Sequence, residues 1–458
     1  MAHLMARENA SFVALHPESA ARSKVAREHL WGGVPMPWMT RWPGEFPLFF
    51  DAASGARFTD VDGIEYVDFC LGDTGAMTGH GLPQVAAALY TQAQRGITTM
   101  LPNDDAAWVA GELASRFGLP YWQMAMTATD ANRFVLRFAR HITGRPRVLV
   151  FNYCYHGTVD ETFAVLSSSG PDSGSVVTRP GSIGPAVNPS QTTVVVEFND
   201  LAALEAALAV GDIACVLAEP ALTNVGIVLP APGYHEALRA LTRKYGTLLV
   251  IDETHTICAG PGGATAAWGL EPDFFVIGKT IGGGMPAAAY GMSAAVADAL
   301  ADDLLTGTID CSGVGGTLTG NALALAAVRA TLSSTLLASD FDYMVPLASS
   351  WAAGVQTVID EFELPWNVQQ LGCRAEYWFC PPPPNGGLAH DAIDDELDQL
   401  MHLYALNRGI LMTPFHNMAL MSPFHTQAEI DLHTSVFRSL VAELVCGSGS
   451  GDSSGRVM

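Results

Sequence analysis

Short apolar runs recur through the middle of the chain and alternate with longer stretches of mixed polarity. The apolar runs cover 147–152, 192–198, 213–218, 248–252 and 273–278, and helical patterns such as 201–210 and 234–244 lie between them. Apolar strands separated by helices are typical of a parallel or mostly parallel sheet whose faces are covered. The pattern therefore predicts a large α/β lobe over residues 72–332.

The two ends of the chain have a different pattern. Residues 49–69 alternate in polarity around Asp60-Val61-Asp62-Gly63, which predicts a hairpin with its turn at these four residues. Residues 333–446 mix helix, strand and a loop of four prolines at 381–384. We expect a second, small α+β lobe built from 333–446 with a contribution from 1–71. The Gly/Ser-rich residues 447–458 are expected to form a flexible tail.

One lysine follows the last of these apolar runs directly. Lys279 lies in Phe274-Phe275-Val276-Ile277-Gly278-Lys279, and glycines 282–284 come next. A lysine leaving a buried strand is desolvated, which favours the neutral amine that forms a Schiff base with an aldehyde. A strand-end lysine that points to solvent fits this run equally well, so the run alone leaves both interpretations open.

A carboxylate pair ends the preceding apolar run. Asp252 and Glu253 follow the strand-like residues 246–251, and acids at this end of a parallel strand point into a ligand crevice. Asp252 precedes Lys279 by 27 positions (279 − 252), which is room for a loop, a connection and the next strand. A salt bridge or a helix cap is the ordinary role of such a pair, but together with Lys279 it favours a cofactor site.

The motifs between residues 249 and 293 resemble those of the class III, fold-type I pyridoxal-phosphate aminotransferases. The matching motifs are Asp252-Glu253, Trp268-Gly269, 278–286 and Tyr290-Gly291. The resemblance extends over about residues 45–441 and includes the glutamate-1-semialdehyde aminomutase and β-amino-acid aminotransferase branch. It implies a mostly parallel sheet of the seven-stranded type, pyridoxal 5'-phosphate as cofactor, and a homodimer.

The resemblance also assigns roles around the cofactor ring. Lys279 would hold the cofactor as a Schiff base and later move the proton, and Asp252 would pair with the pyridine nitrogen to make the ring an electron sink. Tyr155 and His156 match the family's Tyr-His-Gly, which implies that Tyr155 stacks on the ring. Without the resemblance, core packing is the more usual role of an aromatic residue before His-Gly.

Two segments are implied to bind the phosphate. Residues 127–132 align with a Ser-Gly-Thr/Ser-Glu-Ala-Asn turn that opens a helix, so its amides, with Ala128 and the Thr129 hydroxyl, would hold the anion. Thr129 as the helix N-cap is compatible with this role. The family's glycine and glutamate are Ala128 and Asp130 here. Thr317, in a Gly-Thr-x-x-Gly-Asn match, would reach the phosphate of the neighbouring subunit.

Further positions near the ring are expected from the same resemblance. Glu219, before Pro220, matches a strand-end Glu-Pro beside the cofactor, although proline favours a strand end at such a place anyway. Thr254 stands where the family usually has valine, packed on the other face of the ring. For His255 we weigh a direct acid/base role against a supporting role behind the ring, and favour the supporting role.

Arginines are the first candidates for substrate recognition, because their planar fork binds a carboxylate with two hydrogen bonds. Arg41 lies near Gly32-Gly33-Val34, and Arg374 begins a predicted strand in the small lobe. An ion pair between Arg374 and Glu376 is an equally good explanation of this arginine. Trp38, Trp42 and 413–418 add aromatic and amide groups that predict a pocket for a partly hydrophobic substrate.

Composition excludes several other classes of function. The formal net charge of −23 disfavours nucleic acids and anionic membranes as partners. The eight cysteines form no C-x-x-C pair, which indicates reduced thiols and no metal site. The first 24 residues lack the apolar core of a signal peptide, and no apolar run reaches the ~18 residues of a membrane span. We expect a soluble, cytoplasmic protein.

The sequence is therefore interpreted as an aminotransferase that passes an amino group from a primary amine or amino acid to a keto acid. One cofactor serves both halves, which predicts ping-pong kinetics. An aminomutase of the glutamate-1-semialdehyde type, which moves the amino group within one substrate, is the alternative. Racemases and decarboxylases are less favoured. A non-catalytic, cofactor-binding regulatory protein is disfavoured by the combination of Lys279, Asp252 and Thr317.

Overall fold

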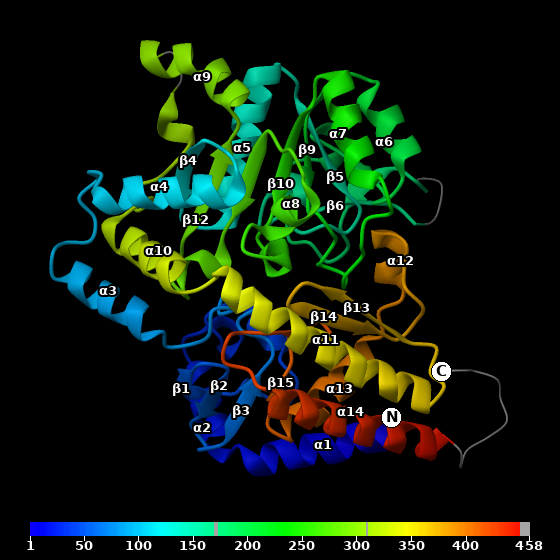
Figure 1. The fold of residues 1–458 in the computed structure, drawn as a ribbon. Helices are drawn as coiled ribbons and strands as arrows, with labels where there is room; N and C mark the ends of the chain where they lie inside the picture. The colour runs from blue at the N-terminus through cyan, green and yellow to red at the C-terminus, as the bar shows by residue number, and fades with distance from the viewer. Residues whose placement is uncertain (169–172, 308–309, 449–458) are drawn as a thin grey trace.

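The computed structural model describes residues 1–168, 173–307 and 310–448. Two groups of elements are visible in Figure 1. The larger is built on a sheet from the middle of the chain, and in the smaller the N-terminal and C-terminal segments lie side by side. Of the predicted tail, residues 447–448 finish a helix, and 449–458 lie outside the described residues.

The larger group contains a seven-stranded sheet within the described residues, in the spatial order β4-β12-β11-β10-β9-β5-β8. β12 is antiparallel to β4 and β11, while the other neighbouring strands are parallel. This confirms the predicted mostly parallel α/β sheet. The strands are β4 Tyr121–Ala125, β5 Arg147–Phe151, β8 Thr193–Val196, β9 Ile213–Ala218, β10 Leu248–Asp252, β11 Phe274–Ile277 and β12 Ala288–Met292.

Helices surround this sheet. α5 packs along β4 and β9 to β12, α7 packs on β10, and α6 packs on β8. The helices of this group are α3 Pro83–Ala93, α4 Asp104–Phe117, α5 Ala128–Thr143, α6 Leu201–Leu208, α7 Tyr234–Tyr245, α8 Gly263–Trp268, α9 Ala294–Thr306 and α10 Ala322–Ser334. A small ribbon of β6 Ala164–Leu166 and β7 Val176–Thr178 lies beside β8.

The smaller group joins the two ends of the chain. β1 Phe50–Ser54, β2 Arg57–Asp60 and β3 Glu65–Asp68 form an antiparallel meander, and β15 Ile410–Leu411 adds to β3 in parallel. The predicted turn at 60–63 connects β2 to β3. A second sheet holds β13 Asn367–Leu371, β14 Arg374–Trp378 and β16 Met418–Leu420. The helices are α1 Ala2–Leu15, α2 Pro17–Ala26, α11 Ala338–Glu361, α12 Gly386–Asp391, α13 Asp395–Leu406 and α14 Gln427–Ser448.

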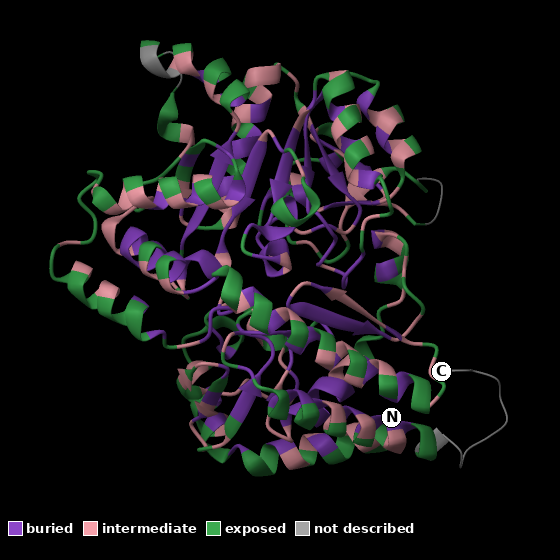
Figure 2. Ribbon diagram, in the orientation of Figure 1, coloured by how far each residue is buried: buried purple, intermediate pink, exposed green. Residues whose placement is uncertain are grey.

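Burial explains why the central strands read as continuous apolar runs. Every residue of β9 and β11 is buried, so neither strand has a solvent face that calls for polar residues. Figure 2 shows the strands of this sheet as the buried centre of the larger group. The ends of these strands are therefore fixed in place, which suits the side chains that follow them.

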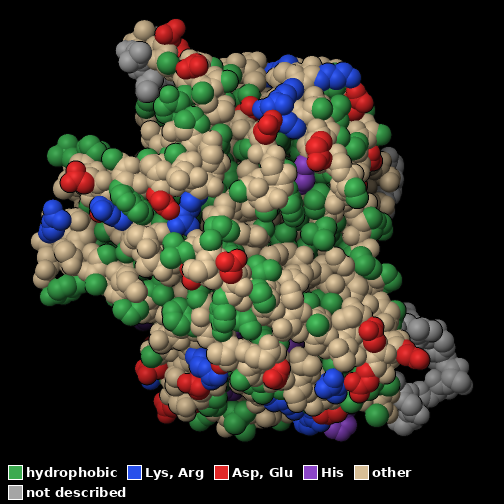
Figure 3. All heavy atoms as spheres, in the orientation of Figure 1, with side chains coloured by type: hydrophobic (Ala, Val, Ile, Leu, Met, Phe, Trp, Pro, Cys, Tyr) green, Lys and Arg blue, Asp and Glu red, His purple; other side chains and the backbone are tan. Residues whose placement is uncertain are grey.

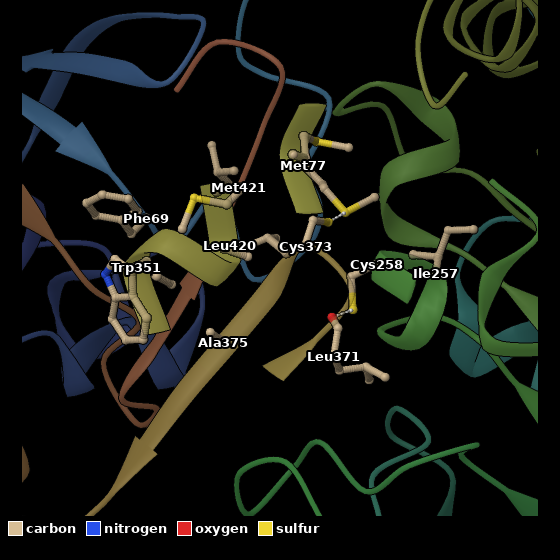
Figure 4. Packing of buried hydrophobic residues seen from close by; sticks show 14 of the residues in the cluster. Phe69, Met77, Ile257, Cys258, Trp351, Leu371, Cys373, Ala375, Leu420 and Met421 are labelled. Atoms are coloured by element: carbon tan, nitrogen blue, oxygen red, sulfur yellow. Dashed lines mark hydrogen bonds between the residues drawn. The ribbon is translucent and has the colours of Figure 1, made fainter. Parts of the chain in front are cut away.

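A second apolar core lies where the two groups meet. Trp351 of α11 is fully buried there, together with residues from the loop after β3 and from β14. Figure 4 shows Cys373 Sγ beside Met77 Sδ at 3.7 Å, and Cys258 Sγ facing the carbonyl oxygen of Leu371 at 3.3 Å. These contacts tie the loop after β3 and the segment after β10 to the small sheet.

Surface charge and helix length bear on the expected partners. On the face drawn in Figure 3, acidic and basic side chains are scattered in small mixed groups. Within the described residues, no single helix has the length and apolar character of a membrane span, although α10 and α11, bent by 73° at their junction, pass both criteria as a pair.

Candidate active site

Lys279 is the second residue after β11 and starts a short 3₁₀ segment, Lys279–Gly282. Its φ of 50° lies in the left-handed region, which a residue with a side chain adopts only at a cost. Its Nζ donates to Asp73 Oδ2 over 2.6 Å and lies 2.8 Å from His255 Nε2. The tight backbone turn therefore aims the amine inward, in contrast to a solvent-facing strand-end lysine.

Asp252 is the last residue of β10 and is buried. Its Oδ2 accepts from Asn132 Nδ2 at 2.8 Å and lies 2.9 Å from His156 Nδ1, while its Oδ1 accepts from the Thr254 amide at 3.0 Å. Burial opposes the charged carboxylate, but these hydrogen bonds and the charge on His156 hold its pKa below the ordinary value. Asp252 is thus kept as an anion away from water.

His156 and Glu219 contact residues that line the cavity and hold them in position. Burial opposes a positive charge on His156, but its interactions with Cys154 and with Asp252 raise its pKa to about 10. Glu219 accepts from the amide of Tyr155 at 3.2 Å and from the amide of Thr223 at 3.1 Å, and burial raises its pKa. Glu219 therefore fixes the backbone that carries Tyr155, and Tyr155 itself lines the cavity.

The first turn of α5 forms another part of the site. Thr127 is the N-cap, because its Oγ1 accepts from the amide of Asp130 at 3.2 Å, so the N-cap role expected for Thr129 was wrong. The Thr129 hydroxyl instead accepts from the amide of Thr158 at 3.0 Å. Gly157 lies so close that a Cβ added to it would sit 2.1 Å from Thr129 Oγ1. The glycine turn and the helix start thus form one cradle.

These segments enclose a cavity of about 500 Å³. Its lining brings together Ala128, Thr129, Tyr155, Asp252, Thr254, His255 and Lys279. A buried anion, an amine and a helix N-terminus at one cavity fit the three parts of pyridoxal phosphate, namely its ring nitrogen, its aldehyde and its phosphate. Among the described residues, no group of three or more His, Cys, Asp or Glu side chains is arranged to hold a metal ion.

The other predicted residues lie elsewhere. Thr317 is exposed on the segment before α10 and is not part of this cavity lining. Arg41 is exposed at the end of a short 3₁₀ segment, Pro37–Arg41. Trp38 of that segment packs edge-on against Phe415 with ring centres 5.6 Å apart, so the structure joins two of the predicted aromatic segments. Their roles with substrate or neighbour stay predictions.

Arg374 is buried at the start of β14. Its Nη2 donates to Glu376 Oε2 at 2.9 Å and to the carbonyl oxygen of Thr223 at 3.1 Å, which is the ion pair weighed as the alternative to substrate binding. Its Nε and Nη1 are buried with no hydrogen-bond partner among the described residues. Since Arg374 does not line the 500 Å³ cavity, its proposed contact with a substrate carboxylate requires that cavity to extend toward it.

The sequence interpretation missed two residues that reach the site. Asp73, in the loop after β3, contacts Lys279, and Asn132, the fifth residue of α5, contacts Asp252. Asn132 lies in the 127–132 turn motif, which predicts phosphate binding but no contact with Asp252. For Asp73 the available signal was an acid between glycines, in Gly72-Asp73-Thr74-Gly75.

Comparison with known proteins gives a consistent picture. The model of the family described as "Aminotransferase class-III" matches residues 38–342. A glutamate-1-semialdehyde 2,1-aminomutase of Desulfitobacterium hafniense is 33% identical over 406 residues, covering 88% of this chain and 92% of that protein. A solved glutamate-1-semialdehyde-aminomutase of Pseudomonas aeruginosa PAO1, in complex with PMP, is 50% identical with a TM-score of 0.94, covering 96% of this chain and 98% of the other.

A transaminase is also similar. The structure of an omega-transaminase from Sphaerobacter thermophilus has a TM-score of 0.83 at 26% identity and covers 93% of this chain and 97% of the other. The fold is thus shared by enzymes named for both kinds of amino-group transfer, with higher identity on the aminomutase side.

Proposed function

Because this chain belongs to the class-III aminotransferase family, whose members depend on pyridoxal phosphate, we propose that it moves an amino group within a single substrate, as an aminomutase of the glutamate-1-semialdehyde type. The observation that carries this proposal is the similarity to the P. aeruginosa aminomutase, at 50% identity over 96% of the chain. The aminotransferase expected from the sequence is less well supported, because the transaminase structure is only 26% identical.

When bound, the cofactor supplies an electron sink next to the substrate carbon. Asp252 presents a carboxylate that Asn132 and His156 orient and keep charged, as a partner for the ring nitrogen. Lys279 Nζ is the base that takes a proton from the substrate carbon and returns it to a neighbouring atom. The first turn of α5, with Thr129, would hold the phosphate.

We assign a homodimer to the working enzyme and place Thr317 at the neighbouring site, as the family resemblance implies. Its exposed position on the segment before α10 supports this assignment, since the residue is free to reach another subunit. Arg41 and Arg374 remain the candidates for a substrate carboxylate, with Trp38 beside the apolar part of the substrate. Arg41→Ala should raise KM for a carboxylate substrate with kcat little changed, and an unchanged KM would remove Arg41 from the proposal.

The deciding experiment supplies glutamate-1-semialdehyde alone to the enzyme loaded with cofactor. An aminomutase converts it over many turnovers, with no keto acid present, to the isomer whose amino group has moved from carbon 2 to carbon 1. Lys279→Ala is the matched control and should form no isomer. If no isomer accumulates, and a primary amine with pyruvate or 2-oxoglutarate turns over repeatedly, the enzyme is an aminotransferase instead.

A further inference from the structure

Two side chains from separate loops meet the amine of Lys279. Asp73 follows β3 by five positions, and His255 follows β10 by three. The Lys279 Nζ lies 2.6 Å from Asp73 Oδ2 and 2.8 Å from His255 Nε2. An ammonium group has three donors, so it satisfies both acceptors and keeps one donor for the cavity.

The hydrogen bonds of His255 fix its tautomer. An ammonium group at Lys279 Nζ can only donate, and it lies 2.8 Å from Nε2, so the ring proton belongs on Nδ1, which lies 3.1 Å from the Thr74 hydroxyl. The Nε2 lone pair then faces Lys279 as an acceptor. Burial and the positive charge of Lys279 lower the pKa of His255 to about 3, which leaves the ring neutral at physiological pH.

Asp73 is held in place by an unusual loop. Leu71, Asp73 and Thr74 all have positive φ, at 46°, 50° and 80°. Such conformations are costly for residues with side chains and persist where the surrounding structure imposes them. Burial opposes a charge on Asp73, but the positive charge and the hydrogen bond of Lys279 lower its pKa well below the ordinary value, so it stays an anion. Its Oδ1 is buried with no hydrogen-bond partner among the described residues.

We propose that Asp73 and His255 form a holding site for the free ammonium group of Lys279, used whenever that lysine is not bonded to the cofactor. In the catalytic cycle this is the state in which Lys279 carries the transferred proton. The holding site keeps the proton on Nζ and keeps Nζ beside the cavity. The inference requires only the cofactor of the family and stands whether the reaction is an aminomutation or a transamination.

Other titratable or charged groups lie near Asp73 and His255. His416 and Arg374 approach these two residues from the small lobe, and Tyr155 and Cys70 lie near Asp73. Arg374 is already paired with Glu376, and Cys70 is a buried thiol. The contacts to Nζ come only from Asp73 and His255 among the described side chains, so these two are the positioning residues to test.

The test uses the full-length chain stripped of cofactor and measures how fast it captures added pyridoxal phosphate as a Schiff base, by absorbance, over a range of pH. Capture needs Nζ to lose a proton and leave its contacts with Asp73 and His255, so weakening the holding site should speed capture. In Asp73→Asn the ammonium group loses its anionic partner, so capture should be about tenfold faster at the low end of the pH range. His255→Leu should shift the profile in the same direction.

Two further variants separate positioning from a general structural effect. His255→Gln retains an acceptor oxygen and should restore the wild-type profile. His433→Gln changes another buried histidine, packed between Trp351 and Phe437, and should leave the profile unchanged. Wild-type profiles in both Asp73→Asn and His255→Leu would overturn the proposal. If Asp73→Asn fails to fold, the comparison of His255→Leu with His255→Gln decides alone. Failure of the wild-type chain to capture the cofactor would instead contradict the proposed function.

Discussion

His156 Nδ1 lies 2.9 Å from Asp252 Oδ2, with both side chains buried at the end of the central sheet. The pair joins positions 96 residues apart, and Asn132 adds a second donor to the same oxygen. The pKa of His156 is raised and that of Asp252 is lowered, so each side chain favours its charged form. The sheet therefore presents an oriented carboxylate at one side of the cavity.

Replacing this charge should affect chemistry more than binding. Asp252→Asn keeps the size and one acceptor oxygen but removes the charge that supports a protonated ring nitrogen. We expect kcat to fall by about 10²-fold or more, with the cofactor Kd changed far less. Absorbance titration and steady-state kinetics measure the two effects separately. A variant with normal kcat would show that the ring nitrogen needs no anionic partner here.

The cradle at the start of α5 gives a second prediction. Gly157 has a φ of 76°, and a Cβ there would lie 2.1 Å from Thr129 Oγ1, so Gly157→Ala must push Thr129 and the helix start apart. We expect the cofactor Kd to rise by about tenfold or more, because the phosphate donors move. Gly144→Ala is the matched control. Its φ is 64° but its Cβ meets nothing within 4 Å, so it should cost about 1 kcal/mol of stability and leave the Kd unchanged.

The sequence predicted the buried strands and the motif residues for clear physical reasons. β5, β8, β9, β10 and β11 are continuous apolar runs, and the sequence pattern predicts them. It does not predict β4 and β12. β4 has exposed and buried residues in irregular order, and β12, Ala-Ala-Tyr-Gly-Met, has three small residues and no β-branched residue. The local pattern therefore predicts a strand where large apolar or β-branched residues follow one another, which is not the case in β4 and β12.

Within the site, the sequence placed residues that follow a strand or open a helix, because these positions depend on local structure. Asp73 was missed since its contact with Lys279 spans 206 positions and depends on how the loop after β3 packs. Arg374 shows the same limit, because its pairing with Glu376 was one of two possibilities until the burial of β14 was known. The contact of Asp73 and the burial of Arg374 both depend on packing between parts of the chain that are distant in sequence.

The assignment of a shared site rests on Thr317, which is exposed and absent from the lining of the cavity formed by its own chain. In a dimer with shared sites, Thr317→Ala loses a hydrogen bond to a charged phosphate, a loss of about 1.5–3 kcal/mol. The cofactor Kd should then rise by about tenfold or more, as measured by equilibrium dialysis. Thr319→Ala in the same segment is the control. An unchanged Kd for Thr317→Ala would contradict the shared-site arrangement.

Asp398, near the start of α13, gives a prediction about stability and pH. Burial raises the pKa of its carboxyl from 3.8 to about 6, although its Oδ1 accepts from Asn417 Nδ2 at 2.6 Å. A raised carboxyl pKa means that the folded state favours the protonated form. The folded protein is therefore destabilised by the charge of Asp398 as the pH rises from 4 through 6, and this penalty stays constant at higher pH.

Asp398→Asn removes the charge and keeps the oxygen that faces Asn417. A two-unit shift corresponds to at most about 3 kcal/mol, and because the side chain is partly exposed we expect a gain on the order of 1–2 kcal/mol above pH 7. At pH 4 the variant and the wild type should unfold alike. Urea unfolding at pH 4, 6 and 8 measures the difference, and Asp342→Asn, an exposed aspartate on α11, controls for net charge. A gain that is equal at all three pH values would show that ionisation of Asp398 is not its source.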